Sequence, residues 1–219
     1  VDVIALPKRT TIEDARKAGA ALAKARGTSE LLIMAGNNRK SAEIAMGVAL
    51  RGYTFTDHKS NEGAPDTASV RMMVSKPEEV EAAAAPRLAV AQGVFFTRDL
   101  VNEPANVLTT TEFANRLAAM QDIGLTVEVL EEDALAKLGM GALLSVGQGS
   151  DSPSKVVVMH WNGGAKDAAP LALIGKGVVF DTGGISLKPA GGMEDMTMDM
   201  GGAGVVSGVM RALALRKAQ

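Results

Sequence analysis

The sequence contains no cysteine, and His58 and His160 are the only histidines among its 219 residues. The lack of cysteine excludes disulfides, thiolate nucleophiles and thiolate-bound metal ions. Any metal ion would therefore be held mainly by carboxylates. His160 follows an apolar, strand-like run and precedes Trp161, so we interpret it as a structural residue rather than a ligand.

Long apolar runs are also missing from the sequence. No stretch approaches the roughly 20 apolar residues of a membrane span, and the N-terminus lacks the basic and then apolar order of a signal peptide. A net charge of -2, with 47% hydrophobic and 22% charged residues, indicates an ordinary globular protein and gives no sign of nucleic-acid binding. We therefore predict a cytoplasmic protein with no membrane partner.

The chain alternates between helical and strand-like patterns. Thr11 precedes Asp14 at the spacing of a capping box, and Pro77 suits the first turn of a later helix. Strands are predicted over residues 31–34, 70–74, 125–130, 143–146, 156–161 and 171–174, with 178–180 continuing as extended chain. Helices are predicted over residues 11–27, in a segment ending near 52, and over 77–101, 111–120, 132–138 and 203–216.

Three of these patterns carry further expectations. The apolar runs 31–34 and 171–174 are typical of strands buried on both faces. Pro86 lies inside an alanine-rich helical stretch and should kink or break the helix near Arg87. The alternation of strands and helices predicts the α/β class, with a mixed sheet flanked by helices and a site at the strand ends.

Glycine, lysine and aspartate gather in one segment late in the chain. Nine of the 24 glycines lie between residues 175 and 204, where they allow close approaches of the backbone. Asp181 follows a strand-like run, and Asp195 and Asp199 precede the last predicted helix. Buried carboxylates need a counter-charge, which lysine or a divalent metal ion would supply. The segment therefore predicts a metal site.

The chemistry of such a site follows from its ligand types. Oxygen ligands suit magnesium, manganese and, at the border, zinc. Two metal ions about 4 Å apart that share a carboxylate can activate water and polarise a carbonyl, and Asp181 is the candidate for sharing. A lysine can bind a metal ion only when it is neutral, so the site would have to lower its pKa by several units.

The pattern Gly-Lys-Gly-(x)3-Asp-(x)2-Gly-(x)3-Lys-Pro at residues 175–189, followed by Met-(x)2-Asp-Met-(x)-Gly at 196–202, resembles the first metal-binding segment of the leucyl, or cytosol, aminopeptidase family. The upstream stretch RDLVNEPANVLT at 98–109 is similar to the start of that family's catalytic domain. The resemblance implies three parts: residues 1–76 end an N-terminal α/β domain, 77–101 form a linking helix, and 102–219 begin the metallopeptidase domain.

The resemblance also implies a role for each matching residue. Lys176 and Asp199 would bind the tighter metal ion, Asp181 would bridge two divalent ions (manganese or zinc, or else magnesium), and Lys188 would be catalytic. Its ammonium group would polarise the scissile carbonyl and stabilise the oxyanion. Met196 would line an apolar pocket for the first side chain of a peptide substrate. The implied reaction is hydrolysis of the N-terminal peptide bond, with preference for residues such as leucine, by a homohexamer.

One part of the family pattern is missing. The second half of the site, Asn-Thr-Asp-Ala-Glu-Gly-Arg in the family, does not occur before Gln219. The chain also begins at Val1 without methionine and stops inside a helical pattern, so we expect it to be truncated at both ends. A catalytically incomplete fragment that acts only as an assembly or binding module is therefore an alternative.

A second alternative rests on Asp181-Thr182-Gly183, which follows two apolar residues as in aspartic peptidases. In that class two carboxylates share a proton and activate water without a metal ion. The chain contains no second such motif. A dimer could supply one, but the alternating helices disagree with the all-β fold of that class.

Overall fold

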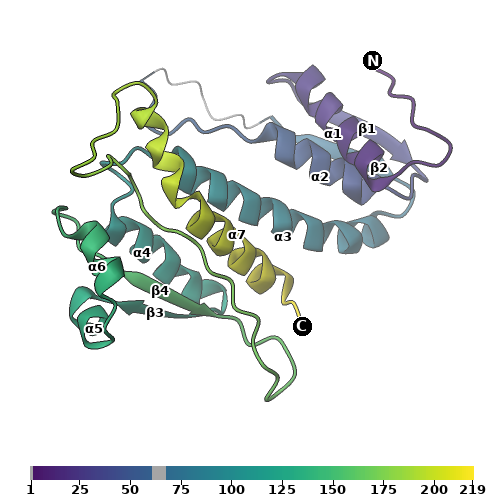
Figure 1. Ribbon diagram of the computed structural model, residues 1–219. Helices are drawn as coiled ribbons and strands as arrows, with labels where there is room; N and C mark the ends of the chain where they lie inside the picture. Colours follow the sequence, from purple (N-terminus) through teal and green to yellow (C-terminus); the bar gives the residue numbers. More distant parts are fainter. Residues whose placement is uncertain (1, 61–67) are drawn as a thin grey trace. The chain divides into compact units, whose positions relative to one another are not determined.

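The computed structural model describes residues 2–60 and 68–219 (Figure 1). The chain forms two compact units, Val1–Ala91 and Gln92–Gln219, and the boundary between them falls within the long helix α3 (Pro77–Asn102). Helices and short strands alternate through both units, which confirms the α/β class. The predicted division at residues 76 and 101 stays a prediction.

The first unit begins with helix α1 (Ile12–Arg26), whose start follows from its cap. Thr11 accepts a hydrogen bond from the backbone N–H of Asp14 at 3.1 Å, and the Asp14 carboxylate accepts one from the backbone N–H of Thr11 at 2.9 Å. This reciprocal pair is the capping box that the sequence predicts. The helix ends at Gly27, whose φ of 57° favours glycine.

Two parallel strands form the sheet of the first unit, β1 (Leu31–Gly36) and β2 (Val70–Val74). Ile33 is buried, whereas Met34 is 78% exposed. The prediction that residues 31–34 are buried on both faces is therefore wrong. Successive side chains of a strand point to opposite faces of the sheet. In β1 the side chains on one face are more buried than those on the other, so the apolar residues alternate in burial.

Helix α2 (Ser41–Gly52) packs against α1 and carries a buried carboxylate, Glu43. Its side chain is 4% exposed and accepts hydrogen bonds from Nε of Arg16 at 2.8 Å and from Nε of Arg87 at 2.5 Å. Burial opposes ionisation, but the hydrogen bonds from Arg87 and Arg16 outweigh it and hold the pKa of Glu43 below its ordinary value. The cluster links α1, α2 and the first half of α3.

Replacing Glu43 with glutamine is expected to lower the free energy of unfolding by about 3 kcal/mol at pH 7, because two guanidinium groups lose their buried counter-charge. The lowered pKa means that the carboxylate stabilises the fold above the ordinary glutamate value of 4.5, and that this contribution disappears as the pH falls through the folded-state pKa. Urea unfolding of the complete polypeptide that contains these 219 residues, at pH 7 and pH 3.5, measures both effects.

Glu13→Gln is the matched control for this prediction. Glu13 pairs with Lys17 on α1, but its side chain is 73% exposed, so the change should stay within about 0.5 kcal/mol. If Glu13→Gln and Glu43→Gln are equally stable at pH 7, the cluster contributes nothing and the prediction is wrong.

Helix α3 runs without a break from Pro77 to Asn102, so the prediction that Pro86 divides it is wrong. Proline inside a helix removes one backbone hydrogen bond and costs about 3 kcal/mol. Tertiary contacts oppose this cost, because Ala84 and Ala89 are buried and Arg87 donates a hydrogen bond to Glu43 on α2. Within α3, Arg87 also donates a hydrogen bond to the carbonyl of Ala83.

The second unit joins the end of α3 to α4 (Thr110–Ala118), the 3₁₀ helix η1 (Ala119–Ile123), β3 (Thr126–Leu130), α5 (Glu132–Lys137), α6 (Gly141–Gly147), β4 (Val156–His160), the 3₁₀ helix η2 (Met193–Met200) and α7 (Gly201–Arg216). Strands β3 and β4 pair antiparallel, from Thr126 opposite His160 to Leu130 opposite Val156. The buried core contains Leu100, Leu108, Phe113, Leu117, Met120, Leu125, Met200, Met210 and Ala214.

Two strand predictions in this unit are wrong. Residues 143–146 belong to helix α6, because a short apolar run does not distinguish a helix from a strand. Residues 171–174 pair with no other strand among the described residues. Leu171 is 87% exposed and Ile174 is 94% exposed, so residues 171–174 are not buried either.

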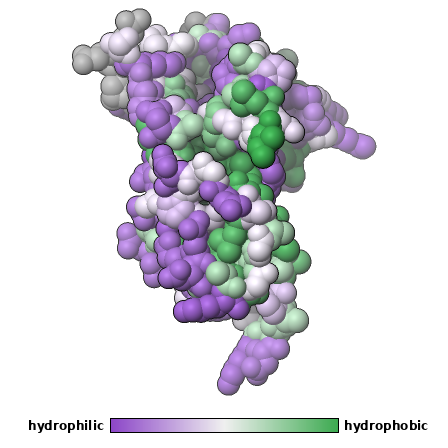
Figure 2. All heavy atoms as spheres, turned by 60° about the vertical axis from the view of Figure 1, so that its left-hand side comes forward, coloured by the Kyte–Doolittle hydropathy of each residue, from purple (hydrophilic) through white to green (hydrophobic). Residues whose placement is uncertain are grey.

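Apolar side chains also reach the surface elsewhere on the face shown in Figure 2, where hydrophobic and hydrophilic residues are interspersed. Over the described ranges 2–60 and 68–219, no helix combines the length and the apolar character that a membrane span needs.

Candidate functional site

The predicted site residues lie on the segment that leads into helix α7. Residues 175–192 have no regular secondary structure, η2 follows at Met193, and α7 begins at Gly201 (Figure 1). Met200, at the end of η2, is fully buried in the core of the second unit. The segment is therefore anchored at its end, directly beside Asp199.

Lys188 and Asp181 form one ion pair, with Nζ of Lys188 2.6 Å from Oδ2 of Asp181. The other carboxylate oxygen accepts a hydrogen bond from the backbone N–H of Gly183 at 2.8 Å. The backbone N–H of Lys188 donates to the carbonyl of Thr182 at 2.9 Å, which closes the loop between the two charged residues.

Gly183 has a conformation that this loop requires. Its φ is 90°, and a Cβ at this position would lie 2.2 Å from the carbonyl oxygen of Ser186. Any side chain would be both strained and in collision with the backbone. The glycine thus allows the turn that brings Lys188 back to Asp181.

The electrostatic state of Asp181 follows from these contacts. The pKa of Asp181 lies below its ordinary value, mainly because the side chain of Lys188 donates a hydrogen bond to the carboxylate. The hydrogen bond from the backbone N–H of Gly183 and the charges of Lys188 and Lys176 lower the pKa further. Asp181 is therefore ionised at neutral pH and lies within the field of both lysines.

Lys176 and Asp199 form the second ion pair, between Nζ and Oδ2. The Asp199 side chain is 22% exposed, and its Oδ2 is buried without a hydrogen bond of good geometry. The backbone N–H of Ala203 donates to the carbonyl of Lys176 at 2.8 Å, so the first turn of α7, which begins two residues after Asp199, holds the backbone of Lys176. The structure thus brings together the four charged residues as two pairs.

These residues fit part of a metal site. A buried carboxylate oxygen with no hydrogen bond, next to an amine, is the arrangement that a divalent cation can complete. In the part of the chain that the structure describes, no three side chains of the Asp, Glu, His or Cys type converge as in a complete site. Asp181, Asp199 and Lys176 are the side chains of this segment that could donate to a metal ion, and a complete site would need further ligands.

Met196 and the remaining acidic residues of η2 are placed differently. Met196 is half-buried, whereas Asp195 and Glu194 are exposed. Glu194 accepts a hydrogen bond from the backbone N–H of Gly192 at 2.9 Å, a local contact. His160 lies exposed at the end of β4, opposite Thr126.

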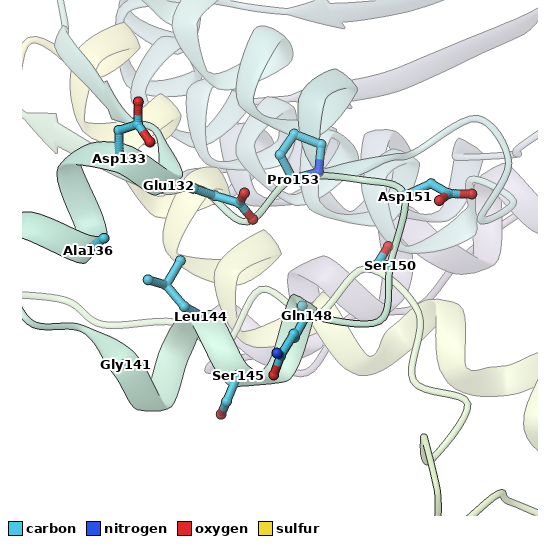
Figure 3. A pocket seen from close by; sticks show the side chains of 11 residues that line it. Glu132, Asp133, Ala136, Gly141, Leu144, Ser145, Gln148, Ser150, Asp151 and Pro153 are labelled. Carbon is cyan, nitrogen blue, oxygen red and sulfur yellow. The ribbon is translucent and has the colours of Figure 1, made fainter.

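A separate hollow of about 590 Å³ lies between α5, α6 and the loop that follows α6 (Figure 3). Its lining includes Glu132, Asp133 and Asp151 but none of the four charged residues of the lysine and aspartate pairs. The carboxylate of Glu132 accepts a hydrogen bond from the backbone N–H of Ser154 at 2.7 Å, which ties the loop to α5. The hollow is therefore distinct from the candidate site.

Residues 95–219 match the catalytic domain of the cytosol aminopeptidase family. A probable cytosol aminopeptidase from Dinoroseobacter shibae is 62% identical over the whole chain, and one from Cereibacter sphaeroides is 59% identical. The fold and the paired lysines and aspartates thus occur on an α/β catalytic domain, and the chain belongs to the cytosol aminopeptidase family. The chain spans about half the length of these relatives, 44% and 45% respectively.

Solved structures share the fold of this chain. The bottromycin maturation enzyme BotP in complex with Mn is 32% identical, with a TM-score of 0.76 over 94% of this chain and 45% of that protein. A tomato leucine aminopeptidase shares the fold, with a TM-score of 0.77 over 94% of this chain and 43% of that protein at 24% identity.

Proposed function

We propose that the complete polypeptide containing these residues is a metal-dependent aminopeptidase that hydrolyses the N-terminal peptide bond of peptides. The observation that carries the proposal is the presence of two lysine–aspartate pairs, Lys176 with Asp199 and Lys188 with Asp181, on a catalytic-domain segment of this family. The two lysines would serve different purposes. Lys176 would bind a metal ion, whereas Lys188 would stay protonated and positively charged.

The proposed ligands are Lys176, Asp181 and Asp199. Asp181 would bridge two divalent ions, and Lys176 and Asp199 would complete the tighter site. When bound, the ions would supply Lewis acidity and would lower the pKa of water. Manganese is supported by the related BotP, whose structure is a complex with Mn, and zinc and magnesium also suit oxygen donors. Lys176 would have to lose its proton to bind, after which Asp199 would face the cation instead of an ammonium group.

Lys188 is proposed as the catalytic residue. Its side chain is 34% exposed and its ammonium group contacts Asp181. In the proposed reaction, Nζ of Lys188 would donate a hydrogen bond to the carbonyl oxygen of the scissile bond. The developing oxyanion would then be stabilised by a fixed positive charge, which is worth more in the transition state than in the ground state.

Met196 is half-buried and apolar, which suits a pocket for an N-terminal side chain such as leucine. A homohexamer in the cytoplasm is proposed from the family resemblance alone. A catalytically incomplete fragment, acting as an assembly or binding module, is the competing proposal, because the chain spans about half the length of its relatives. Family membership removes the support for an aspartic peptidase at Asp181.

Removal of metal ions tests the proposed reaction. Treating the complete polypeptide with a chelator is expected to abolish release of the anilide from leucyl anilides, and Mn²⁺ or Zn²⁺ should restore it, because the water and the carbonyl would both lose their Lewis acid. The assay is the absorbance of the released anilide before and after dialysis against each metal ion.

The same assay separates the competing proposals. Activity that ignores the chelator would contradict the metal-dependent reaction. A folded polypeptide that is inactive under all metal conditions would favour the binding module. Leucyl, glutamyl and lysyl anilides compared at equal concentration would test the apolar preference, which requires the leucyl substrate to be the fastest.

A further inference from the structure

We propose that Gly175 is a positioning residue for the metal site, because it allows Lys176 to lie against the first turn of helix α7, next to Asp199. The inference rests on the proposed function, since it concerns the same ligands. Gly175 itself has no side chain that could bind a metal ion or the substrate.

Both proposed ligands are attached to one turn of helix. Ala203, in the first turn of α7, donates its backbone N–H to the carbonyl of Lys176 at 2.8 Å. Asp199 lies two residues before the start of α7 at Gly201. The distance between the two ligands is therefore set by how closely the backbone at residues 175 and 176 approaches this turn.

The approach is closer than any side chain at residue 175 would allow. A Cβ on Gly175 would lie 2.5 Å from Cα of Ala203, 2.6 Å from its backbone N and 2.6 Å from the carbonyl oxygen of Gly202. All three are backbone atoms, so no rotamer change can relieve the collision. Either the helix or the segment carrying Lys176 would have to move.

The helix is the part that cannot easily move. Thr97 on α3 donates its hydroxyl hydrogen bond to the carbonyl of Gly204 at 2.9 Å, and a Cβ on Gly93 would lie 2.3 Å from the carbonyl oxygen of Gly208. The first two turns of α7 are thus packed directly on the α3 backbone. The segment before Lys176 has no strand partner among the described residues, so it would be the part displaced.

Two nearby glycines provide a graded comparison. A Cβ on Gly202 would lie 3.1 Å from the backbone N of Lys176, a moderate overlap. A Cβ on Gly177 would lie 3.4 Å from Cβ of Ala203, an ordinary contact. Substitution by alanine should therefore disturb Lys176 most at residue 175, less at 202 and least at 177.

The test is Mn²⁺ affinity of the complete polypeptide, measured by isothermal titration for Gly175→Ala, Gly202→Ala and Gly177→Ala. Gly175→Ala is expected to weaken binding about 10- to 100-fold, the range for changes that misplace a ligand without removing it. Gly202→Ala should weaken it less, and Gly177→Ala should match the wild type.

Thermal unfolding distinguishes positioning from loss of fold. Alanine in place of Gly202 favours the helix, so its melting temperature should hold or rise while Mn²⁺ binding weakens. A melting temperature that holds or rises while Mn²⁺ affinity falls would support the positioning role, even if Gly175→Ala fails to fold. If Gly202→Ala and every folded variant bind Mn²⁺ like the wild type, the positioning role is wrong and the proposed function stands. A wild type that binds no Mn²⁺ overturns both.

Discussion

Replacing Asp181 with asparagine is expected to weaken binding of divalent ions by more than about 100-fold, since even changes outside the ligand set cost 10- to 100-fold. Aminopeptidase activity should be lost with the metal ions. Asparagine keeps the side-chain shape, and its amide oxygen can still accept the hydrogen bond that Gly183 donates at 2.8 Å. The loop should therefore persist, and the loss would report the missing charge.

Elemental analysis of the purified complete polypeptide, with its activity on leucyl anilides, measures this prediction. Asp195→Asn is the matched control, because Asp195 lies in η2 on the same segment but is exposed. It should keep the metal content and the activity of the wild type. Equal metal content in Asp181→Asn and Asp195→Asn would remove Asp181 from the ligand set.

Replacing Lys188 with methionine is expected to lower kcat by about 10²- to 10³-fold, the usual effect of removing a group that stabilises an oxyanion. KM should change little, because the contact strengthens only as charge develops on the oxygen. Metal content should remain, since bound cations would balance the charge of Asp181 in place of the ammonium group that lies 2.6 Å away.

Steady-state kinetics and elemental analysis together separate this role from a structural one. Lys166→Met is a suitable control, because Lys166 is exposed in the loop after β4. If Lys188→Met loses its metal ions, Lys188 supports the ligands rather than the substrate. If it keeps both metal and kcat, the catalytic role of Lys188 is wrong.

Local signals in the sequence predicted much of the fold. The cap of α1 depends on Thr11 and Asp14, which are neighbours along the chain, and its bonds form as the spacing predicts. Long periodic segments, such as the last helix, were also predicted within two residues of the observed start at Gly201. Local hydrogen bonds decide these elements, so a linear pattern is sufficient.

The misassigned elements depend on contacts that a linear pattern does not contain. Residues 143–146 are apolar enough for either structure, and nothing local excludes the helix that forms. Pro86 breaks isolated helices, but the ion pair between Arg87 and Glu43 helps to hold α3 together. Residues 171–174 resemble a strand, yet a strand needs a neighbour to pair with, and none of the described strands pairs with them.

In the candidate site, too, the sequence predicted some features, and others depend on contacts between distant residues. The resemblance identified Lys176, Asp181, Lys188 and Asp199, and the structure pairs them by charge. The close approach of Gly175 to Ala203 was missed, because the two residues lie on different elements. The high density of glycine after residue 175 was the only sequence signal for this close approach. It does not identify which of the glycines lies against helix α7.

Electron paramagnetic resonance of the Mn²⁺-loaded complete polypeptide tests the central claim most directly. If Asp181 bridges two ions about 4 Å apart, the wild type should show the multiline spectrum of two coupled Mn²⁺ ions, and Asp181→Asn should not. A wild-type spectrum of isolated ions alone, in an enzyme that is active with manganese, would contradict the account.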